Sequence, residues 1–172
     1  MPPHPLHRPR WLTRRLSSRP YLLGGCLLLL VGSTHFVRLN LSPSVPLGLY
    51  TLHALPTPLT PGLLVVLPTP ALVRRWVSWP ASALLKPVAA VAGEEVCVED
   101  GTLVIRGWDY GPVYHEAGGT ALPHLDEGCQ TVPEGMVFLA SQASRSLDSR
   151  YFGPIRTKNI TARAMPFFTW KH

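Results

Sequence analysis

Apolar runs and one alternating segment predict short strands rather than long helices. Leu63–Leu67 is an uninterrupted aliphatic run between turn residues, which is typical of a buried strand. Val96–Ile105 alternates strand formers on both sides of Asp100-Gly101, a pair that favours a tight hairpin turn. Met136–Ala140 predicts another strand, whereas residues 107–128 show no clear period and are predicted to be irregular.

The composition favours a mainly β domain. The 172 residues include 19 prolines and 14 glycines, which divide the chain into short elements and disfavour long soluble helices. With 46% hydrophobic and 15% charged residues, the chain has enough apolar material for one packed core. This balance excludes the disordered class.

The strongest apolar run, residues 21–37, directly follows a basic segment, residues 1–20, that contains five arginines and no acidic residue. This order follows the positive-inside rule and predicts a cytoplasmic tail (1–20) and a transmembrane signal-anchor helix (21–37). Residues 38–172 then form the exported domain, which is periplasmic if the membrane is a bacterial inner membrane. The run is shorter than the roughly 20 residues of a full span. Because Val31-Gly32-Ser33 also suits signal cleavage, the retention of residues 1–33 stays open.

The formal net charge of +6 comes largely from this tail. The exported part is nearly neutral, which argues against a nucleic-acid-binding domain, because such a domain carries its basic residues on the binding surface.

Ala71–Trp79 combines arginines and tryptophans in a pattern that predicts a short amphipathic helix. These residues suit a membrane–water interface, where amphipathic rings and basic groups both find partners. An ordinary surface helix with buried tryptophan fits the pattern equally well.

The three cysteines divide between the apolar run, which holds Cys26, and the exported part, which holds Cys97 and Cys129. An oxidising compartment permits a disulfide between Cys97 and Cys129, and two buried free thiols are the alternative. No histidine stands at ligand spacing from these cysteines, so no metal site is expected.

Lys86 lies in Leu84–Ala92, an otherwise apolar run. Loss of hydration lowers the pKa of a lysine amine, so the neutral form becomes available as a general base near neutral pH. The alternative is a lysine at a strand edge whose stem covers apolar surface while its ammonium group reaches water.

Ser42 and Ser44 stand two residues apart among prolines that restrict the backbone. A rigid turn at this point holds both hydroxyls in place, which makes Ser44 a candidate nucleophile. A Ser/Pro-rich linker behind a membrane segment is the alternative.

Three blocks, in order, carry a family resemblance. They are Ser42-Pro43-Ser44 followed by Pro-Leu-Gly-Leu-Tyr, Leu-Lys-Pro-Val-Ala-Ala-Val-Ala-Gly-Glu around Lys86, and Ser-Leu-Asp-Ser-Arg-Tyr-Phe-Gly-Pro from Ser146. From about Asn40 to Pro166 the chain resembles the type I signal peptidases, and most closely their conjugative-transfer branch, the TraF-type pilin-processing peptidases. The resemblance implies a signal-peptidase-like antiparallel sheet domain after one N-terminal transmembrane helix.

The resemblance also implies a serine–lysine dyad, with Ser44 as nucleophile and Lys86 as general base. It makes the Ser42 hydroxyl and the Ser44 backbone N–H the oxyanion hole, and Ser146 the residue that orients the lysine amine. All ten carboxylates lie after Gly93, so the Ser44 region has no local acid, and a dyad needs none.

Asp148 and Arg150 match a structural ion pair beneath the site in this family. The chain departs from the general signal peptidase pattern at Val45, which follows the expected nucleophile, and at Glu94, which ends the lysine block. These departures leave the dyad intact and the substrate pocket undefined.

The implied partner is a membrane-inserted precursor, a conjugative pilin precursor in this branch, cleaved after small residues at the inner membrane. Other conjugative-transfer proteins are further expected partners, and neither a cofactor nor nucleic acid is expected. The sequence does not distinguish hydrolysis of the acyl-enzyme from cyclisation of the product. A catalytically silent, membrane-anchored assembly factor is the alternative function.

Overall fold

The computed structural model describes residues 36–77 and 83–170. The predicted basic tail lies outside these residues, and so does the predicted transmembrane helix except for its last two positions. Phe36 stands in a turn and Val37 opens the first strand, so strand structure is present where the predicted helix ends. Within the described ranges, no helix has the length and apolar character that a membrane span requires.

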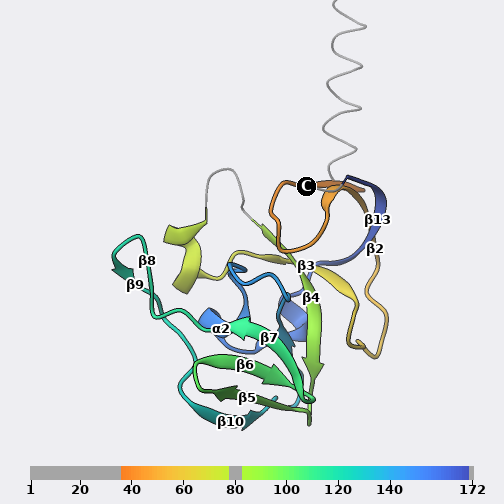
Figure 1. Ribbon diagram of the computed structural model, residues 1–172. Coiled ribbons are helices and arrows are strands. Elements are labelled where there is room, and N and C mark those ends of the chain that lie inside the picture. Colours follow the sequence, from red (N-terminus) through yellow and green to blue (C-terminus); the bar gives the residue numbers. More distant parts are fainter. Residues whose placement is uncertain (1–35, 78–82, 171–172) are drawn as a thin grey trace, which may run out of the picture. The chain divides into compact units, whose positions relative to one another are not determined.

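An antiparallel sheet of seven strands forms the larger part of the domain and confirms the predicted mainly β fold (Figure 1). Its order in space is β1-β2-β13-β3-β4-β11-β12. The strands span Val37–Asn40 (β1), Leu47–His53 (β2), Leu64–Pro68 (β3), Ala83–Val91 (β4), Met136–Leu139 (β11), Ile155–Arg156 (β12) and Ala162–Trp170 (β13). Strand β13 inserts between β2 and β3, which ties the end of the described chain to its beginning.

A second antiparallel sheet, in the order β10-β5-β6-β7, lies beyond the end of β4 (Figure 1). Its strands span Glu95–Glu99 (β5), Thr102–Ile105 (β6), Trp108–Pro112 (β7) and Gly128–Thr131 (β10). Asp100 and Gly101 join β5 to β6 with φ angles of 48° and 71°, the backbone that a tight hairpin turn requires. The predicted hairpin is therefore confirmed.

Residues 107–128 are more regular than predicted. They contain β7 and a small hairpin of β8 (Glu116–Ala117) and β9 (Thr120–Ala121). The prediction of an irregular segment was wrong because Gly111 and Pro112 obscure the period of β7, which gains its pairing from β6 across a register shift.

Strand β4 contributes to three hydrophobic clusters, which explains why its sequence is apolar on both faces. Leu84 and Val88 pack with β3 and β11, Ala89 and Ala90 pack with β5 and β6, and Leu85 packs with Tyr50 of β2 and Ala164 of β13. Lys86 stands in the middle of this strand, and its residue is only 3% exposed. The alternative of a lysine that reaches water from a strand edge therefore does not apply.

Gly48 explains the glycine of the Pro-Leu-Gly-Leu-Tyr block. Its φ angle is 153°, and a Cβ atom at this position would lie 2.2 Å from the carbonyl oxygen of Phe168. Only glycine lets β13 approach β2 so closely beside the irregular register at Pro166–Phe168.

The predicted helix after β3 is a short 3₁₀ helix, η1 (Ala71–Trp76), and Trp79 lies outside the described residues. Within this helix Val73 is buried, and the Arg75 guanidinium lies 4.0 Å from the Trp76 ring centroid. Two further helices follow β11: α2 (Ser149–Phe152) and the 3₁₀ helix η2 (Thr157–Asn159).

Strands β1 and β13 present exposed apolar side chains on one face. Val37 and Met165 share Thr51 as register partner, and Leu39 and Phe168 share Leu49, so these side chains point to the same side of β2. We call this surface the apolar face; it consists of Val37, Leu39, Met165 and Phe168, with Phe36, Leu41, Phe167 and Trp170 at its margins. All eight are exposed, Phe167 by 74% and Phe36 by 69%.

Candidate active site

Ser44 lies in the turn between β1 and β2, and a buried asparagine holds that turn together. The Asn40 side-chain amide donates to the carbonyl oxygens of Ser42, Val45 and Pro46 at 2.8–3.1 Å, while the backbone N–H of Ser42 donates to Asn40 Oδ1. The Tyr50 hydroxyl donates to Pro46 O at 2.6 Å from the opposite side. The sequence therefore forms a fixed turn here, and not a flexible linker.

The chain brings Lys86 to Ser44 from a strand that is distant in sequence. Lys86 Nζ lies 2.5 Å from Ser44 Oγ and 2.9 Å from Ser146 Oγ, at hydrogen-bond distance from both. Val65 is its register partner on β3, so the backbone of Lys86 is fixed by the centre of the sheet. Lys86 thus contacts both serines that are expected to form the dyad and its support.

Burial sets the protonation of Lys86. Removal of the ammonium group from water lowers the pKa of Lys86 from its ordinary value of 10.5 to about 8; the negative charge of Asp148 opposes this shift and the positive charge of Arg150 adds to it. With a pKa of about 8, roughly one amine in ten is neutral at pH 7, compared with fewer than one in a thousand for a free lysine.

Asp148 and Arg150 form a fully buried ion pair, with Arg150 Nη2 at 2.7 Å from Asp148 Oδ2. Burial lowers the pKa of Arg150, but its hydrogen bonds to Asp148 and the charge of that carboxylate outweigh the burial, so the net pKa lies above its ordinary value. The guanidinium group also donates to the carbonyl oxygens of Tyr110, Ser141 and Ala143. Arg150 therefore connects β7 of the second sheet to the segment that follows β11.

Ser42 stands beside the predicted nucleophile. Its Oγ lies 2.9 Å from Ser44 Oγ, and either hydroxyl can donate in this contact. The residue is exposed, so its hydroxyl can turn toward a substrate oxygen, as a donor to a developing oxyanion must.

A cavity of about 450 Å³ opens at Ser44. Most of its lining is small or cyclic, which leaves room for a substrate chain beside Ser44. The lining residues are Pro43, Ser44, Val45, Pro46, Gly62, Leu64, Pro87, Val88, Tyr110, Ala140, Ser141, Gln142 and Ala143. This cavity lies between the turn that contains Ser44, the β3–β4 pair and the segment after β11.

Sequence reasoning missed two polar residues at this site. Asn40, at the end of β1, organises the turn, and Ser141, after β11, donates a hydrogen bond from its hydroxyl to the Ser44 carbonyl oxygen. Asn40 stands two residues before the first family block, which is a weak signal. Ser141 stands in a serine-rich segment in which no pattern distinguishes it.

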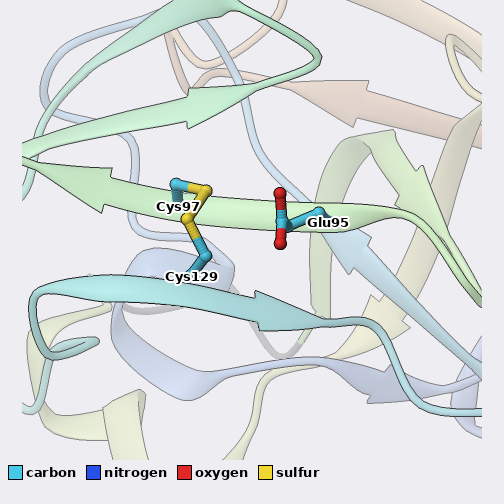
Figure 2. Close-up of side chains that lie close together, drawn as sticks. All are labelled: Glu95, Cys97 and Cys129. Atoms are coloured by element: carbon cyan, nitrogen blue, oxygen red, sulfur yellow. A yellow bond between two sulfur atoms is a disulfide. The ribbon is translucent and has the colours of Figure 1, made fainter.

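Cys97 and Cys129 form a disulfide between the neighbouring strands β5 and β10 (Figure 2). Glu95 lies beside them, and within the described part of the chain these three residues make the only cluster of potential metal ligands. Both sulfur atoms are used in the disulfide bond, so the Glu95 carboxylate is the one potential metal ligand that remains in this cluster. A hollow of about 600 Å³ on this sheet is lined by charged residues and contains neither Ser44 nor Lys86.

Comparison with known proteins decides the family. The family model described as "Signal peptidase, peptidase S26" matches residues 21–170. The chain belongs to this signal peptidase family. Within it, the chain is 34% identical over 147 residues to a conjugal transfer protein TraF of Agrobacterium tumefaciens (strain 15955), a match that covers 77% of this chain and 82% of that protein. Another TraF, from Agrobacterium fabrum (strain C58 / ATCC 33970), is 33% identical, with 87% and 90% covered.

A signal peptidase I crystal structure from Enterococcus faecalis V583 is a further match. The sequence identity is 22% and the TM-score is 0.39, with 61% of this chain and 95% of that chain covered. The sequence resemblance to the signal peptidases and to their TraF branch is thus confirmed by the family match and by the TraF relatives.

Proposed function

We propose that this member of the signal peptidase family is an active serine endopeptidase, in which Ser44 is the nucleophile and Lys86 the general base. One observation carries the proposal: a lysine amine, desolvated at the centre of a sheet, lies 2.5 Å from a serine hydroxyl in a rigid turn beside a cavity. Lysine is rare in such an environment, because burial of its charge is costly. A buried lysine beside a cavity is therefore a candidate for a functional role of its neutral amine.

The acylation step follows from these contacts. Neutral Lys86 Nζ takes the proton from Ser44 Oγ as that oxygen bonds to the scissile carbonyl carbon. Negative charge then develops on the carbonyl oxygen and is stabilised by the Ser42 hydroxyl and the Ser44 backbone N–H. When the C–N bond breaks, the Lys86 ammonium returns the proton to the leaving amine, and an ester on Ser44 remains. Ser146 accepts a hydrogen bond from Lys86 and keeps the amine directed at Ser44.

The second half of the reaction repeats this proton transfer. Lys86, neutral again, removes a proton from the attacking group, and Ser44 recovers its proton as the ester breaks. If water attacks, the product has a free carboxyl group. If an amine of the substrate attacks, the product is cyclic and lighter than the hydrolysed product by one water.

A precursor protein is the substrate class that fits this site best. The relatives are named conjugal transfer proteins, and the chain belongs to a signal peptidase family, which together support a pilin precursor. The family resemblance implies small side chains on the acyl side of the cleaved bond, and the cavity beside Ser44, which Gly62, Ala140 and Ala143 help to line, is where they would bind.

We infer that the apolar face rests on the bilayer and brings Ser44 to a membrane-bound precursor. The face begins at Phe36, near the end of the apolar run of residues 21–37, and residues 36–93 and 149–172 contain no acidic side chain. A surface without negative charge suits anionic lipid headgroups. This placement agrees with a single-pass protein of the inner membrane whose peptidase domain lies in the periplasm.

Replacement of Phe167 and Phe168 by serine in the full chain tests the bilayer contact. We expect slower cleavage of a membrane-embedded precursor and unchanged cleavage of a soluble peptide with the same scissile bond. Trp108→Ser, an equally exposed aromatic on the second sheet, is the matched control. An equal loss on both substrates would argue against a role of the apolar face at the membrane.

Mass spectrometry of processed precursor tests the activity itself. Membranes that carry the full chain are incubated with the pilin precursor of the same transfer system, and Ser44→Ala and Lys86→Arg are compared with wild type. Both variants should leave the precursor intact. Ser44→Ala removes the attacking hydroxyl, and the arginine of Lys86→Arg does not lose its proton at working pH. The product mass distinguishes hydrolysis from cyclisation. Equal processing by all three proteins would refute the dyad, and no processing by any of them would favour the silent assembly factor.

A further inference from the structure

Ser141 has more contacts at the site than any assigned role explains. Its residue is only 4% exposed, and its hydroxyl donates to the Ser44 carbonyl oxygen while accepting from the backbone N–H of Ala143 at 3.1 Å. Because the hydroxyl accepts on one side, its single hydrogen is directed at Ser44. A side chain from the segment after β11 thus holds the backbone of the predicted nucleophile.

The backbone of Ser141 is held just as firmly. Its N–H donates to Asp148 Oδ2 at 3.1 Å, and its carbonyl oxygen accepts from Arg150 Nη2 at 2.7 Å. Both partners belong to the fully buried ion pair. Ser141 therefore connects that ion pair directly to Ser44.

We propose that Ser141 is a positioning residue that fixes the Ser44 backbone and so transmits the rigidity of the Asp148–Arg150 ion pair to the nucleophile. The hydrogen bond to the Ser44 carbonyl sets the rotation of the peptide plane that follows Ser44. With Pro43 restricting the backbone before it, the direction of the Ser44 side chain is determined. The proposal rests on the function proposed above and gives the ion pair a second task besides the support of Lys86.

Ser149 provides a matched control in the same segment. It is also fully buried, and its Oγ accepts from the backbone N–H of Leu139 at 3.0 Å, but no contact links it to Ser44. Ser141→Ala and Ser149→Ala each remove one buried hydroxyl and leave one backbone N–H without its acceptor, that of the half-buried Ala143 in the first and of the buried Leu139 in the second. Their effects on stability should be similar, whereas only Ser141→Ala should disturb the nucleophile.

The experiment measures kcat and KM of the full chain in detergent micelles on a synthetic peptide that spans the precursor cleavage site. Ser141→Ala should lower kcat by about 10- to 100-fold, the loss expected when a reacting group is misplaced by a fraction of an ångström to 1 Å. KM and the pH midpoint of the rate should stay near the wild-type values, because the surroundings of Lys86 are intact. Ser149→Ala should keep kcat within about threefold at a similar melting temperature.

Two results would overturn the role of Ser141. The first is a wild-type kcat for Ser141→Ala; the second is an equal fall in kcat for both serine variants, which would indicate general destabilisation. Ser44→Ala is measured in parallel. If Ser44→Ala is inactive while Ser141→Ala is fully active, only the positioning proposal fails; if Ser44→Ala keeps its activity, the proposed function fails.

Discussion

Replacement of Lys86 by methionine should stabilise the protein at pH 7 while it abolishes processing. Methionine has nearly the same length and no charge. The fold lowers the pKa of Lys86 from 10.5 to about 8. This difference corresponds to a reduction of about 3 kcal/mol in the free energy of unfolding while the amine is charged. The loss of the Lys86 hydrogen bonds to Ser44 and Ser146 costs about 1–2 kcal/mol in return. A net gain of about 1–2 kcal/mol is expected.

The sign of this gain depends on pH. Below pH 8 the amine is charged in both the folded and the unfolded states, so the wild type carries the full penalty. As pH rises from about 8 towards 10.5, the folded amine is already neutral while the unfolded one is still charged, and the penalty disappears. The methionine variant should therefore lose its advantage over this interval and become the less stable protein.

Urea unfolding of the full chain in mild detergent, at pH 7 and again near pH 10, measures both effects. Lys158→Met, at an exposed position, is the control and should change the free energy of unfolding by less than about 0.5 kcal/mol. A methionine variant that is less stable than wild type at pH 7, by an amount independent of pH, would refute the reasoning. Lys86 would then not be desolvated, and its use as a base would lose its physical basis.

Three other outcomes are expected. The rate constant kcat/KM should rise about tenfold per pH unit below pH 8 and level off above it, since only neutral Lys86 reacts; a flat profile from pH 6 to 9 would speak against a lysine base. Ser42→Ala should lower kcat by about 10²–10³-fold, as for other single oxyanion donors, and a loss as deep as that of Ser44→Ala would make Ser42 the rival nucleophile. Cys129→Ser should reduce the free energy of unfolding by about 3–4 kcal/mol, because the disulfide closes a loop between positions 32 apart. Urea unfolding measures this, and an unchanged midpoint would contradict it.

The elements that local chemistry determines could be predicted from the sequence. Asp100-Gly101 specifies the hairpin turn through the positive φ angles that it tolerates, and the aliphatic run before Pro68 specifies a buried strand. The apolar run around Lys86 left two possibilities open, a buried lysine and a lysine at a strand edge, and the packing of β4 on both faces decides for the buried one.

The elements that depend on distant partners could not be predicted in this way. Strand β7 forms because its backbone pairs with β6. Strand β13 lies between β2 and β3 through a pairing that no local sequence pattern encodes. The same holds for the candidate site. The stretch from Ser141 to Ser149 contains four serines. The family resemblance assigned Ser146 to the Lys86 amine, but only the positions in space show that Ser141 contacts the Ser44 carbonyl.

The covalent intermediate on Ser44 tests the central claim most directly. The full chain is mixed with the precursor peptide, the reaction is stopped with acid within the first turnovers, and the digested protein is analysed by tandem mass spectrometry. We expect an ester of the acyl fragment on Ser44, which fragmentation separates from Ser42, and no adduct in Ser44→Ala. Turnover without any adduct on Ser44, or an adduct on Ser42 instead, would contradict a dyad of Ser44 and Lys86.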